Sequence, residues 1–480
     1  MRIPILLISF LATCASVYAQ TAGNKNYIKV ELTEPGTLSQ ALGDRANTID
    51  SLVVEGTINE ADFYTMWRAA TFGRLSAINL EKANAEDNRV PTNAFSYPNE
   101  QGDNIMKLRN IILGEGIEEI GANAFAYSMR LKELTLPSTL RTLGDGCFRE
   151  CYNLCGSPLV LPEGLEEIGN SCFTSCTELS EVVLPSTIKS IGNSAFSNTR
   201  LSKINFPEGL EEIGDGAFYG SGLSEVILPE SCLTLKGSEQ FAYNYSLRQL
   251  RLPDGLTAVP ANIASGCPRL SEVNIPSKAV TIGSEAFYGC PLSGTLTLPE
   301  GLTDIGDNAF YGCSGLKEVS FPSSLKTLGR ESCAEWSGVK RIYCHGEIPA
   351  KCQITGNGTG PFGKPDTSVN GGILPNIPVY IPVGSLESYR KAKGWNIFFN
   401  YIELENFTAI QTVEDNGNAT VTCHGGNIII NAKAGEDYSV YSLDGSIIAS
   451  GKVNDTDVSV AVSTGCYIVK VAGNAVKIKM

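Results

Sequence analysis

Two stretches of the chain are spelled almost alike: IGSEAFYGCPLSGTLTLP at residues 282–299 and IGDNAFYGCSGLKEVSFP at residues 305–322. Their shared Ala-Phe pair marks a unit that recurs through the middle of the chain at a nearly constant spacing. Its phenylalanines are Phe125, Phe148, Phe173, Phe196, Phe218, Phe241, Phe287 and Phe310, while Ala264 and Cys333 fill the same slot in two further copies. A fixed period of roughly 23 residues is typical of a solenoid of stacked coils.

Physical chemistry explains why the unit must be repeated. A single coil buries too few apolar side chains to offset the conformational entropy that its backbone loses on folding. Stacking adds strand pairing and contacts between neighbouring Phe and Leu side chains, so that stability becomes a sum of nearest-neighbour terms. Apolar residues at fixed slots, with leucine prominent, predict an α/β to mainly-β leucine-rich repeat solenoid of about ten coils over residues 90–340. We expect the repeat phenylalanines to form its core.

Proline and glycine recur at fixed positions in most coils. A Leu-Pro pair such as Leu184-Pro185 closes a short predicted strand, because proline lacks an N–H and would interrupt the ladder inside the strand. A glycine follows an isoleucine in most units, at Gly121, Gly169, Gly192, Gly214, Gly283 and Gly306. We expect these glycines in tight bends with backbone angles that other residues avoid.

Composition limits the classes of function. The chain has 480 residues, of which 42% are hydrophobic and 18% charged, and this balance predicts a folded protein with a sizeable core. Its net charge is −14 and it contains no run of Lys and Arg, so nucleic acid is not an expected partner. After the first residues, no stretch approaches the roughly 20 apolar residues that span a bilayer.

Residues 1–19 combine one Arg, an apolar run and a small residue at Ala19, which is the layout of a cleaved secretory signal. We therefore expect a protein that is secreted or held at the outer cell surface. Lipid attachment at Cys14 is an alternative to cleavage after Ala19, although the Thr13 that precedes the cysteine fits that alternative poorly.

The segments that flank the repeats have other patterns. Residues 20–89 are expected to form an N-terminal cap with a helix over residues 57–72, and residues 341–405 a C-terminal cap, because the end coils of a solenoid would otherwise expose apolar edges. Residues 406–480 contain short alternating runs separated by turn signals at Asp444-Gly445 and Gly473-Asn474, which predict a small antiparallel β-sandwich. The expected buried face of the helix carries Phe63, Met66, Trp67 and Ala70.

The repeat, with its IGDNAFYGC and LKEVSFPSSLKTLG stretches, resembles the LRR_5-type leucine-rich repeats of BspA-like surface proteins of Bacteroidetes. The resemblance is strong over residues 90–340, and residues 36–67 and 379–404 resemble the caps of such proteins. It implies adhesion and binding to host or bacterial surface proteins or glycoproteins, without catalysis.

The C-terminal segment resembles the sorting domain of the Bacteroidetes type IX secretion route. The resemblance rests on short β-type runs with a basic end and on the residues Tyr441, Asp444, Gly445, Gly465, Tyr467, Lys477 and Lys479. It implies delivery to the cell surface or release from it.

The chain has fifteen cysteines, and four of them, Cys147, Cys151, Cys172 and Cys176, are placed to approach one another on adjacent coils. Four thiolates of this kind could mimic a zinc site, and a disulfide between coils is a second alternative in an exported protein. We favour a third interpretation, in which the slot three residues after the repeat Phe requires a small buried residue, because serine and threonine fill it elsewhere. No metal site is predicted.

No catalytic constellation emerges. The two histidines, His345 and His424, lie in different segments without a surrounding motif and are expected to be solvated. The GTGPFG stretch at residues 358–363 fits a dinucleotide-binding pattern formally, but Pro361 interrupts it and no strand-to-helix turn follows. We predict neither a cofactor nor an enzyme.

Candidate binding residues are tyrosines. Between residues 133 and 320, acids occupy alternate coils in one outward strand column and the next outward column contains no aromatic side chain, which predicts a solvated sheet face. Tyr219, Tyr288 and Tyr311 each follow a repeat Phe and should project from the turn edge, either as a contact strip or as lids over the core. We predict an adhesin-like binding protein. The alternatives are an accessory module in glycan or peptide utilisation, an enzyme that carries the repeats as an accessory, and a structural component of a surface layer.

Overall fold

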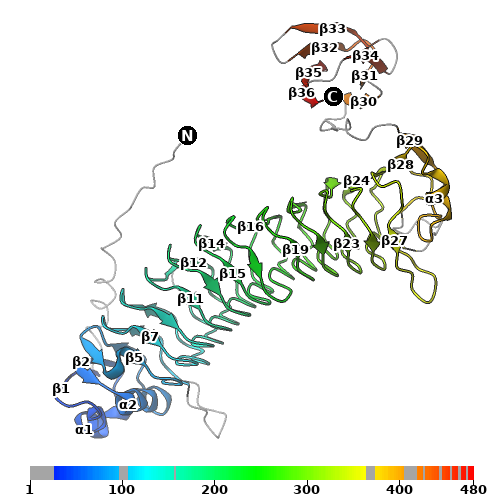
Figure 1. Ribbon diagram of the computed structural model, residues 1–480. Helices are drawn as coiled ribbons and strands as arrows, with labels where there is room; N and C mark the ends of the chain where they lie inside the picture. Colours follow the sequence, from blue (N-terminus) through cyan, green and yellow to red (C-terminus); the bar gives the residue numbers. More distant parts are fainter. Residues whose placement is uncertain are drawn as a thin grey trace.

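The computed structural model describes residues 26–96, 106–155, 158–363 and 373–404, and in the C-terminal region residues 419–424, 427–442, 446–453, 457–462, 466–471 and 474–479. The predicted signal sequence, Cys14, and the turn residues Asp444, Gly445 and Gly465 lie outside these residues. Between Tyr27 and Leu404 the chain winds into a long stack of coils (Figure 1).

Each coil places short strands in one or both of two rows, and all pairing between coils is parallel. The first row consists of β1 (Tyr27–Leu32), β2 (Ser51–Ile58), β3 (Ala77–Asn79), β6 (Asn110–Ile112), β8 (Glu133–Thr135), β10 (Leu159–Val160), β12 (Glu181–Val183), β14 (Lys203–Ile204), β16 (Glu225–Ile227), β18 (Gln249–Arg251), β20 (Glu272–Val273), β22 (Gly294–Thr297), β24 (Leu316–Phe321), β26 (Arg341–Cys344), β28 (Val379–Pro382) and β29 (Tyr401–Leu404). A short strand, β4 (Ala83–Ala85), also pairs with β2.

The second row runs along the other side of the stack (Figure 1). It consists of β5 (Arg89–Val90), β7 (Glu119–Ile120), β9 (Thr142–Leu143), β11 (Glu167–Ile168), β13 (Ser190–Ile191), β15 (Glu212–Ile213), β17 (Thr234–Leu235), β19 (Ala258–Val259), β21 (Thr281–Ile282), β23 (Asp304–Ile305), β25 (Thr327–Leu328) and β27 (Lys351–Cys352).

The described residues make about sixteen turns, so the expected count of about ten coils is wrong. The difference arises at the ends of the stack. The predicted caps lack the Ala-Phe signature, but they still supply strands that pair in register with the first row: β1 to β3 at one end, and β28 and β29 at the other.

The repeat phenylalanines are fully buried and lie one above another along the stack. From Phe95 to Phe241, neighbouring rings are stacked with centroids 5.0 to 5.5 Å apart and interplanar angles of 6° to 10°. The column is interrupted at Ala264 and resumes with Phe287 and Phe310. At the interruption, a buried Ile263 replaces the small residue that precedes the ring in most other coils, so the pair of slots keeps an apolar filling.

The loop that carries each phenylalanine is held by backbone bonds to the next coil. Around Phe196, the N–H groups of Ser194, Phe196 and Asn198 donate to the following coil at 2.7 to 2.8 Å. Ser194 and Asn198 have φ values of 53° and 56°, and residues at these two positions have positive φ in coil after coil. A residue with positive φ two positions before and another two positions after the phenylalanine are therefore regular features of each coil.

The shape of the loop does not depend on the glycines that follow isoleucine. The expectation of unusual backbone angles at Gly121, Gly169, Gly192, Gly214, Gly283 and Gly306 is wrong, because none of them has a positive φ. These glycines instead permit close approach between coils. A Cβ atom at Gly192 would lie 2.7 Å from the backbone nitrogen of Asn170 and 2.9 Å from the carbonyl oxygen of Ile168.

Side chains outside the core also form hydrogen bonds between neighbouring coils. Glu163 accepts hydrogen bonds from the backbone N–H of Ser186, at 3.2 Å, and from its hydroxyl, at 2.9 Å. The same Glu-to-Ser contact joins Glu115 to Ser138 and Glu300 to Ser323. Pro-Glu-Gly or Gly-Glu-Gly turns alternate with Pro-Ser turns on either side of residues 229–255, where Pro-Glu-Ser and Pro-Asp-Gly interrupt the alternation.

The N-terminal cap contains α1 (Leu38–Leu42), the 3-10 helix η1 (Gly43–Asn47) and α2 (Glu60–Thr71), and η2 (Glu86–Asn88) follows. The predicted helix begins three residues later than expected, because the side chain of Asn59 accepts the N–H of Ala61 and caps it. Its four predicted apolar residues, from Phe63 to Ala70, are buried. The buried Asp62 accepts the N–H groups of Leu38 and Asn59 and thereby joins the two α-helices.

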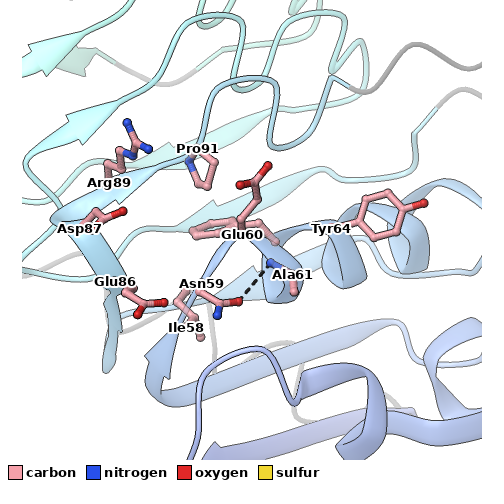
Figure 2. A pocket seen from close by; sticks show the side chains of 10 residues that line it. Ile58, Asn59, Glu60, Ala61, Tyr64, Glu86, Asp87, Arg89 and Pro91 are labelled. Atoms are coloured by element: carbon pink, nitrogen blue, oxygen red, sulfur yellow. Dashed lines mark hydrogen bonds between the residues drawn. The ribbon is translucent and has the colours of Figure 1, made fainter.

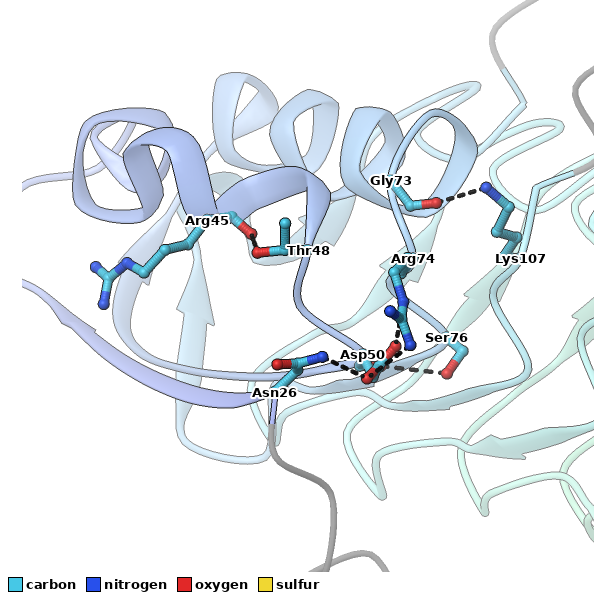
Figure 3. Close-up of polar contacts among 8 residues, drawn as sticks. All are labelled: Asn26, Arg45, Thr48, Asp50, Gly73, Arg74, Ser76 and Lys107. Carbon is cyan, nitrogen blue, oxygen red and sulfur yellow. Dashed lines mark hydrogen bonds and ion pairs between the residues drawn. The ribbon is translucent and has the colours of Figure 1, made fainter.

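Polar contacts tie the first turns together (Figure 3). Asp50 accepts Asn26 Nδ2 and Arg74 Nε, each at 3.1 Å, and its carbonyl oxygen accepts Ser76 Oγ at 3.2 Å. Lys107 Nζ donates to the carbonyl oxygen of Gly73 at 2.5 Å. At the other end of the stack, the helix α3 (Leu386–Lys391) lies beside β28 and β29 (Figure 1).

The C-terminal region forms two antiparallel sheets, as predicted. One contains β30 (Ala419–His424), β31 (Asn427–Ala432) and β34 (Asp457–Ala461), and the other contains β33 (Ile447–Lys452), β32 (Asp437–Ser442), β35 (Cys466–Val471) and β36 (Asn474–Lys479). Val421 and Ile430 of the first sheet share a buried cluster with Val440 and Val469 of the second. None of the helices in the described residues is long and apolar enough to cross a membrane.

Replacement of Gly192 by alanine tests the close approach of the coils. We expect Gly192→Ala to lower the free energy of unfolding by about 1–3 kcal/mol, since the added methyl group would overlap the backbone of the preceding coil. Gly209→Ala is the matched control, because its Cβ atom would meet only ordinary contacts, the nearest at 3.4 Å, and should change stability by less than about 1 kcal/mol. Urea unfolding followed by circular dichroism measures both. Equal effects would contradict this account of the glycines.

Candidate functional site

The predicted tyrosines lie at the turn edge of the stack, but they do not form one strip. Tyr288 and Tyr311 stack on each other with ring centroids 5.0 Å apart and planes 14° apart, while Tyr219 contacts Tyr243 at 5.2 Å. Between the two pairs, the coil of Ala264 has Ser265 in the tyrosine slot. The edge therefore presents two separate pairs of rings.

These rings are only partly available to a partner. Tyr288 is 39% exposed, and Tyr219 and Tyr311 are half-buried. Burial raises the pKa of the Tyr219 and Tyr311 hydroxyls above the ordinary value, so both phenols are neutral and able to donate a hydrogen bond at physiological pH. The edge combines apolar ring faces with hydroxyl groups.

The cysteines three residues after the repeat Phe have a different role from the predicted one. Cys151 and Cys176 lie 3.2 Å from the carbonyl oxygens of Phe125 and Phe148, one coil earlier, and their thiols donate to them. Asn244 Nδ2 and Trp336 Nε1 donate to the equivalent carbonyls of Phe218 and Phe310. Because neither asparagine nor tryptophan is small, the requirement for a small residue is wrong.

Most members of this slot donate to the carbonyl one coil earlier, as Cys267, Cys290 and Cys313 also do. Burial raises the pKa of Cys151 and Cys176 well above the usual range, and a protonated thiol can serve as that donor. A protonated thiol is also a poor metal ligand. Among the residues that the structure describes, no group of three or more His, Cys, Asp or Glu side chains is arranged to hold a metal ion.

His345 is not the solvated loop residue that was expected. It is half-buried just after β26, and its Nε2 lies 2.9 Å from Ser320 Oγ in β24. Burial lowers the pKa of the imidazole, so it is neutral at physiological pH. The side chain of His424 lies outside the described part of the chain.

The outward face of the first row carries aromatic side chains that the sequence did not reveal. Ser320 is in register with Tyr343, and Tyr343 with Tyr380, whose rings stack 4.8 Å apart. The prediction of a face without aromatic residues holds only as far as Ser320. The pair was missed because the C-terminal cap was not recognised as further coils of the same row.

The first row is interrupted three times: between β8 and β10, between β14 and β16, and between β20 and β22. At the last two interruptions an asparagine follows the final strand. Asn274 accepts the N–H of Leu252 at 2.7 Å and donates to its carbonyl oxygen at 2.8 Å, and Asn205 makes the same pair of bonds with Leu184. A side-chain amide thus occupies the backbone groups that a neighbouring strand would use.

The interruption between β20 and β22 opens into a groove of about 490 Å³ on the outer face. Gly294 has a φ of 75° and marks a shift in register between β22 and β24. The floor of the groove is formed by Leu250, Val273, Leu292, Leu296 and Leu316; the four leucines are at most 5% exposed, and Val273 is half-buried. Its polar rim includes Gln249, Arg251, Asp254, Glu272, Asn274 and Thr295. The groove therefore presents its polar rim and the side chain of Val273 to the outside.

A second hollow, of about 560 Å³, lies in the N-terminal cap at the start of α2 (Figure 2). Asn59 and Glu60 line it from the helix, and Glu86, Asp87 and Arg89 from the segment that leads into the second row. Asn59 is already engaged in capping the helix, and the acidic side chains outnumber the single arginine. Ile58, Phe63 and Pro91 complete its lining, so that apolar and polar groups are mixed in it as in the groove at β20 and β22.

The fold and these surfaces define the class of protein: a parallel β-solenoid of leucine-rich repeats with an open outer face. The model of the BspA type leucine rich repeat region matches residues 97–224, 157–270 and 236–350, which together cover more than half of the chain. The chain belongs to this family.

Several solved structures are similar to the chain. A leucine-rich repeat protein from Bacteroides ovatus is 23% identical, with a TM-score of 0.47, over 62% of this chain and 79% of that one. A leucine rich cell surface protein from Faecalibacterium prausnitzii is 17% identical, with a TM-score of 0.34, over 67% and 88%. The pneumococcal vaccine antigen PcpA is 18% identical, with a TM-score of 0.41, over 79% and 93%. Comparison with curated proteins gave no match.

The role of Asn274 at the groove can be tested by substitution. We expect Asn274→Leu to lower the free energy of unfolding by about 1–3 kcal/mol, because it removes both hydrogen bonds from the backbone of Leu252. Thr297→Leu, one coil further along the same outward column, should have a smaller effect, since Thr297 already lies in a paired strand. Urea unfolding compares the two variants. A loss at position 297 as large as that at position 274 would contradict this role.

Proposed function

We propose that the protein is a non-enzymatic, secreted or outer-surface protein that binds host or bacterial surface proteins or glycoproteins, as an adhesin does. The observation that carries the proposal is the groove between β20 and β22, which presents a polar rim around the half-buried Val273 on the outside of the stack. The family membership supports a role in binding, because leucine-rich repeat proteins generally bind proteins.

The tyrosine edge is the second contact surface that we propose. Paired rings such as Tyr288 and Tyr311 offer a large contact area at little cost in side-chain entropy, since stacking already restricts their rotation. Weak contacts at the edge and in the groove would add together on a rigid scaffold. The partner in this proposal is an extended surface and not a small molecule.

Capture from extracellular matrix and mucus tests the tyrosine edge. We expect simultaneous Tyr219→Ser, Tyr288→Ser and Tyr311→Ser substitutions to reduce capture of the partner by about tenfold or more, as expected for loss of aromatic contacts at an interface. The matched control replaces Tyr27 and Tyr64, which are 50% and 41% exposed in the N-terminal cap, by serine. Unchanged capture by the triple variant, with its fold intact by circular dichroism, would rule out the edge as a contact surface.

We further propose that residues 1–19 direct export and that residues 406–480 act as a type IX sorting domain. The independent core of the two C-terminal sheets supports a separate module. Removal of residues 406–480 should abolish surface display and leave the solenoid inside the cell envelope, as measured by protease accessibility and immunostaining of intact cells. Removal of residues 90–340 is the control and should leave display intact. Normal display without the C-terminal module would contradict the sorting role.

A structural role in a surface layer is the alternative that one observation favours. The last coils expose large apolar side chains, with Leu374 59%, Val383 57% and Phe399 69% accessible. A second copy of the chain could cover such an end. Concentration-dependent self-association in sedimentation would favour this alternative over binding of a foreign partner.

A further inference from the structure

The slot directly before the repeat Phe is small in most coils, with alanine at Ala124, Ala195, Ala217, Ala286 and Ala309. In two consecutive coils it holds cysteine instead, at Cys147 and Cys172. Both thiols are free and fully buried, and their sulfur atoms lie 3.2 Å apart. Each sulfur therefore contacts the other across a coil boundary.

The backbone geometry at this boundary suits a covalent bridge. The N–H of Phe148 donates to the carbonyl oxygen of Cys172 at 2.9 Å, so the two coils are stacked at hydrogen-bonding distance at this point. Strands stacked in this way are about 4.8 Å apart, and disulfides join residues whose Cα atoms are about 4.4–6.8 Å apart. A bridge would need only small changes in the side-chain torsions.

The other cysteines of the same two coils are placed differently. Cys151 and Cys176 point their thiols at the carbonyl oxygens of Phe125 and Phe148, and thereby take the role that asparagine and tryptophan have in other coils. Cys147 and Cys172 face each other. Cys151 and Cys176 thus act as hydrogen-bond donors, whereas the sulfur atoms of Cys147 and Cys172 contact each other.

We propose that Cys147 and Cys172 are a modification site that forms a disulfide between adjacent coils. The oxidant is a low-molecular-weight or protein disulfide of an oxidising compartment. The thiolate of one cysteine attacks the oxidant and releases one thiol. The second cysteine then attacks the mixed disulfide, forms the Cys147–Cys172 bond and releases the other thiol. The chain loses two protons and two electrons, and one disulfide is reduced to two thiols.

The bridge forms while the coils assemble. In the finished stack both sulfur atoms are inaccessible, and burial raises the pKa of Cys172, so little of the reactive thiolate is present. From Phe125 onward, the bridge spans the longest interval between consecutive repeat units, the one from Phe148 to Phe173. It would restrict the unfolded chain across the one coil whose length departs most from the common period. Its formation in the cell depends on the export proposed above.

Oxidative refolding of the full mature chain tests the proposal independently of export. The chain is reduced and unfolded, then refolded in a mixture of reduced and oxidised glutathione, and its peptides are mapped by mass spectrometry without reduction. We expect a cross-linked peptide that contains Cys147 and Cys172 and has lost the mass of two hydrogen atoms. We also expect reduction to lower the melting temperature of the refolded chain by several degrees.

Two variants serve as controls. Cys147→Ala introduces the residue found in neighbouring coils, and it should abolish both the cross-link and the effect of reduction on melting. Cys151→Ser keeps a donor toward Phe125 and should leave the cross-link intact. If the reduced chain does not refold, the same map is made after the folded chain is incubated with oxidised glutathione at the onset of thermal unfolding.

Three results would overturn the proposal. The first is a folded chain in which Cys147 and Cys172 can both be alkylated after denaturation. The second is a cross-link that joins either residue to Cys151 or Cys176. The third is stoichiometric zinc held by the four reduced thiols.

Discussion

The hydrogen bonds that run from one coil to the next are the interaction on which this structure depends. In the Phe-bearing loops the amide of the phenylalanine donates to the coil that follows, at 2.7 to 2.9 Å from Phe125 to Phe241. This spacing keeps the rings 5.0 to 5.5 Å apart and nearly parallel. It also excludes a Cβ atom at positions such as Gly192, where the coils meet backbone to backbone. Ring stacking, glycine placement and strand register are thus consequences of a single separation.

That separation explains how much of the fold could be predicted from the sequence. The recurrence of Phe125 through Phe310 reports the length of a coil directly, because each copy must place the same side chain above the last. The end coils could not be counted in this way, since β1 to β3, β28 and β29 pair through backbone groups and need no particular residue. The Glu-to-Ser contacts had a visible signal in the alternation of Pro-Glu-Gly and Pro-Ser turns.

The candidate groove was harder to predict because it lies where the first row of strands is interrupted, between β20 and β22. Asn274 looks like any polar residue of an outward column, but its amide takes over the backbone groups of Leu252 in the preceding coil, at the point where β20 ends. Gly294 adds a left-handed residue and a shift of register, and the core leucines beneath become the floor of the groove. Tyr219, Tyr288 and Tyr311 could be picked out because each follows a repeat phenylalanine, but their pairing depends on which neighbouring coils also carry rings.

The most direct test of coils as interchangeable units is to compare the unfolding of two deletion variants. One lacks residues 174–196, a full period between Phe173 and Phe196, and the other lacks residues 174–185, about half a period. The account predicts that the longer deletion leaves a β-rich protein that unfolds cooperatively in urea, because the next coil restores every contact in register. It predicts that the shorter deletion destroys cooperative unfolding, since it moves inward side chains outward. Equal behaviour of the two variants, or greater damage from the longer deletion, would contradict it.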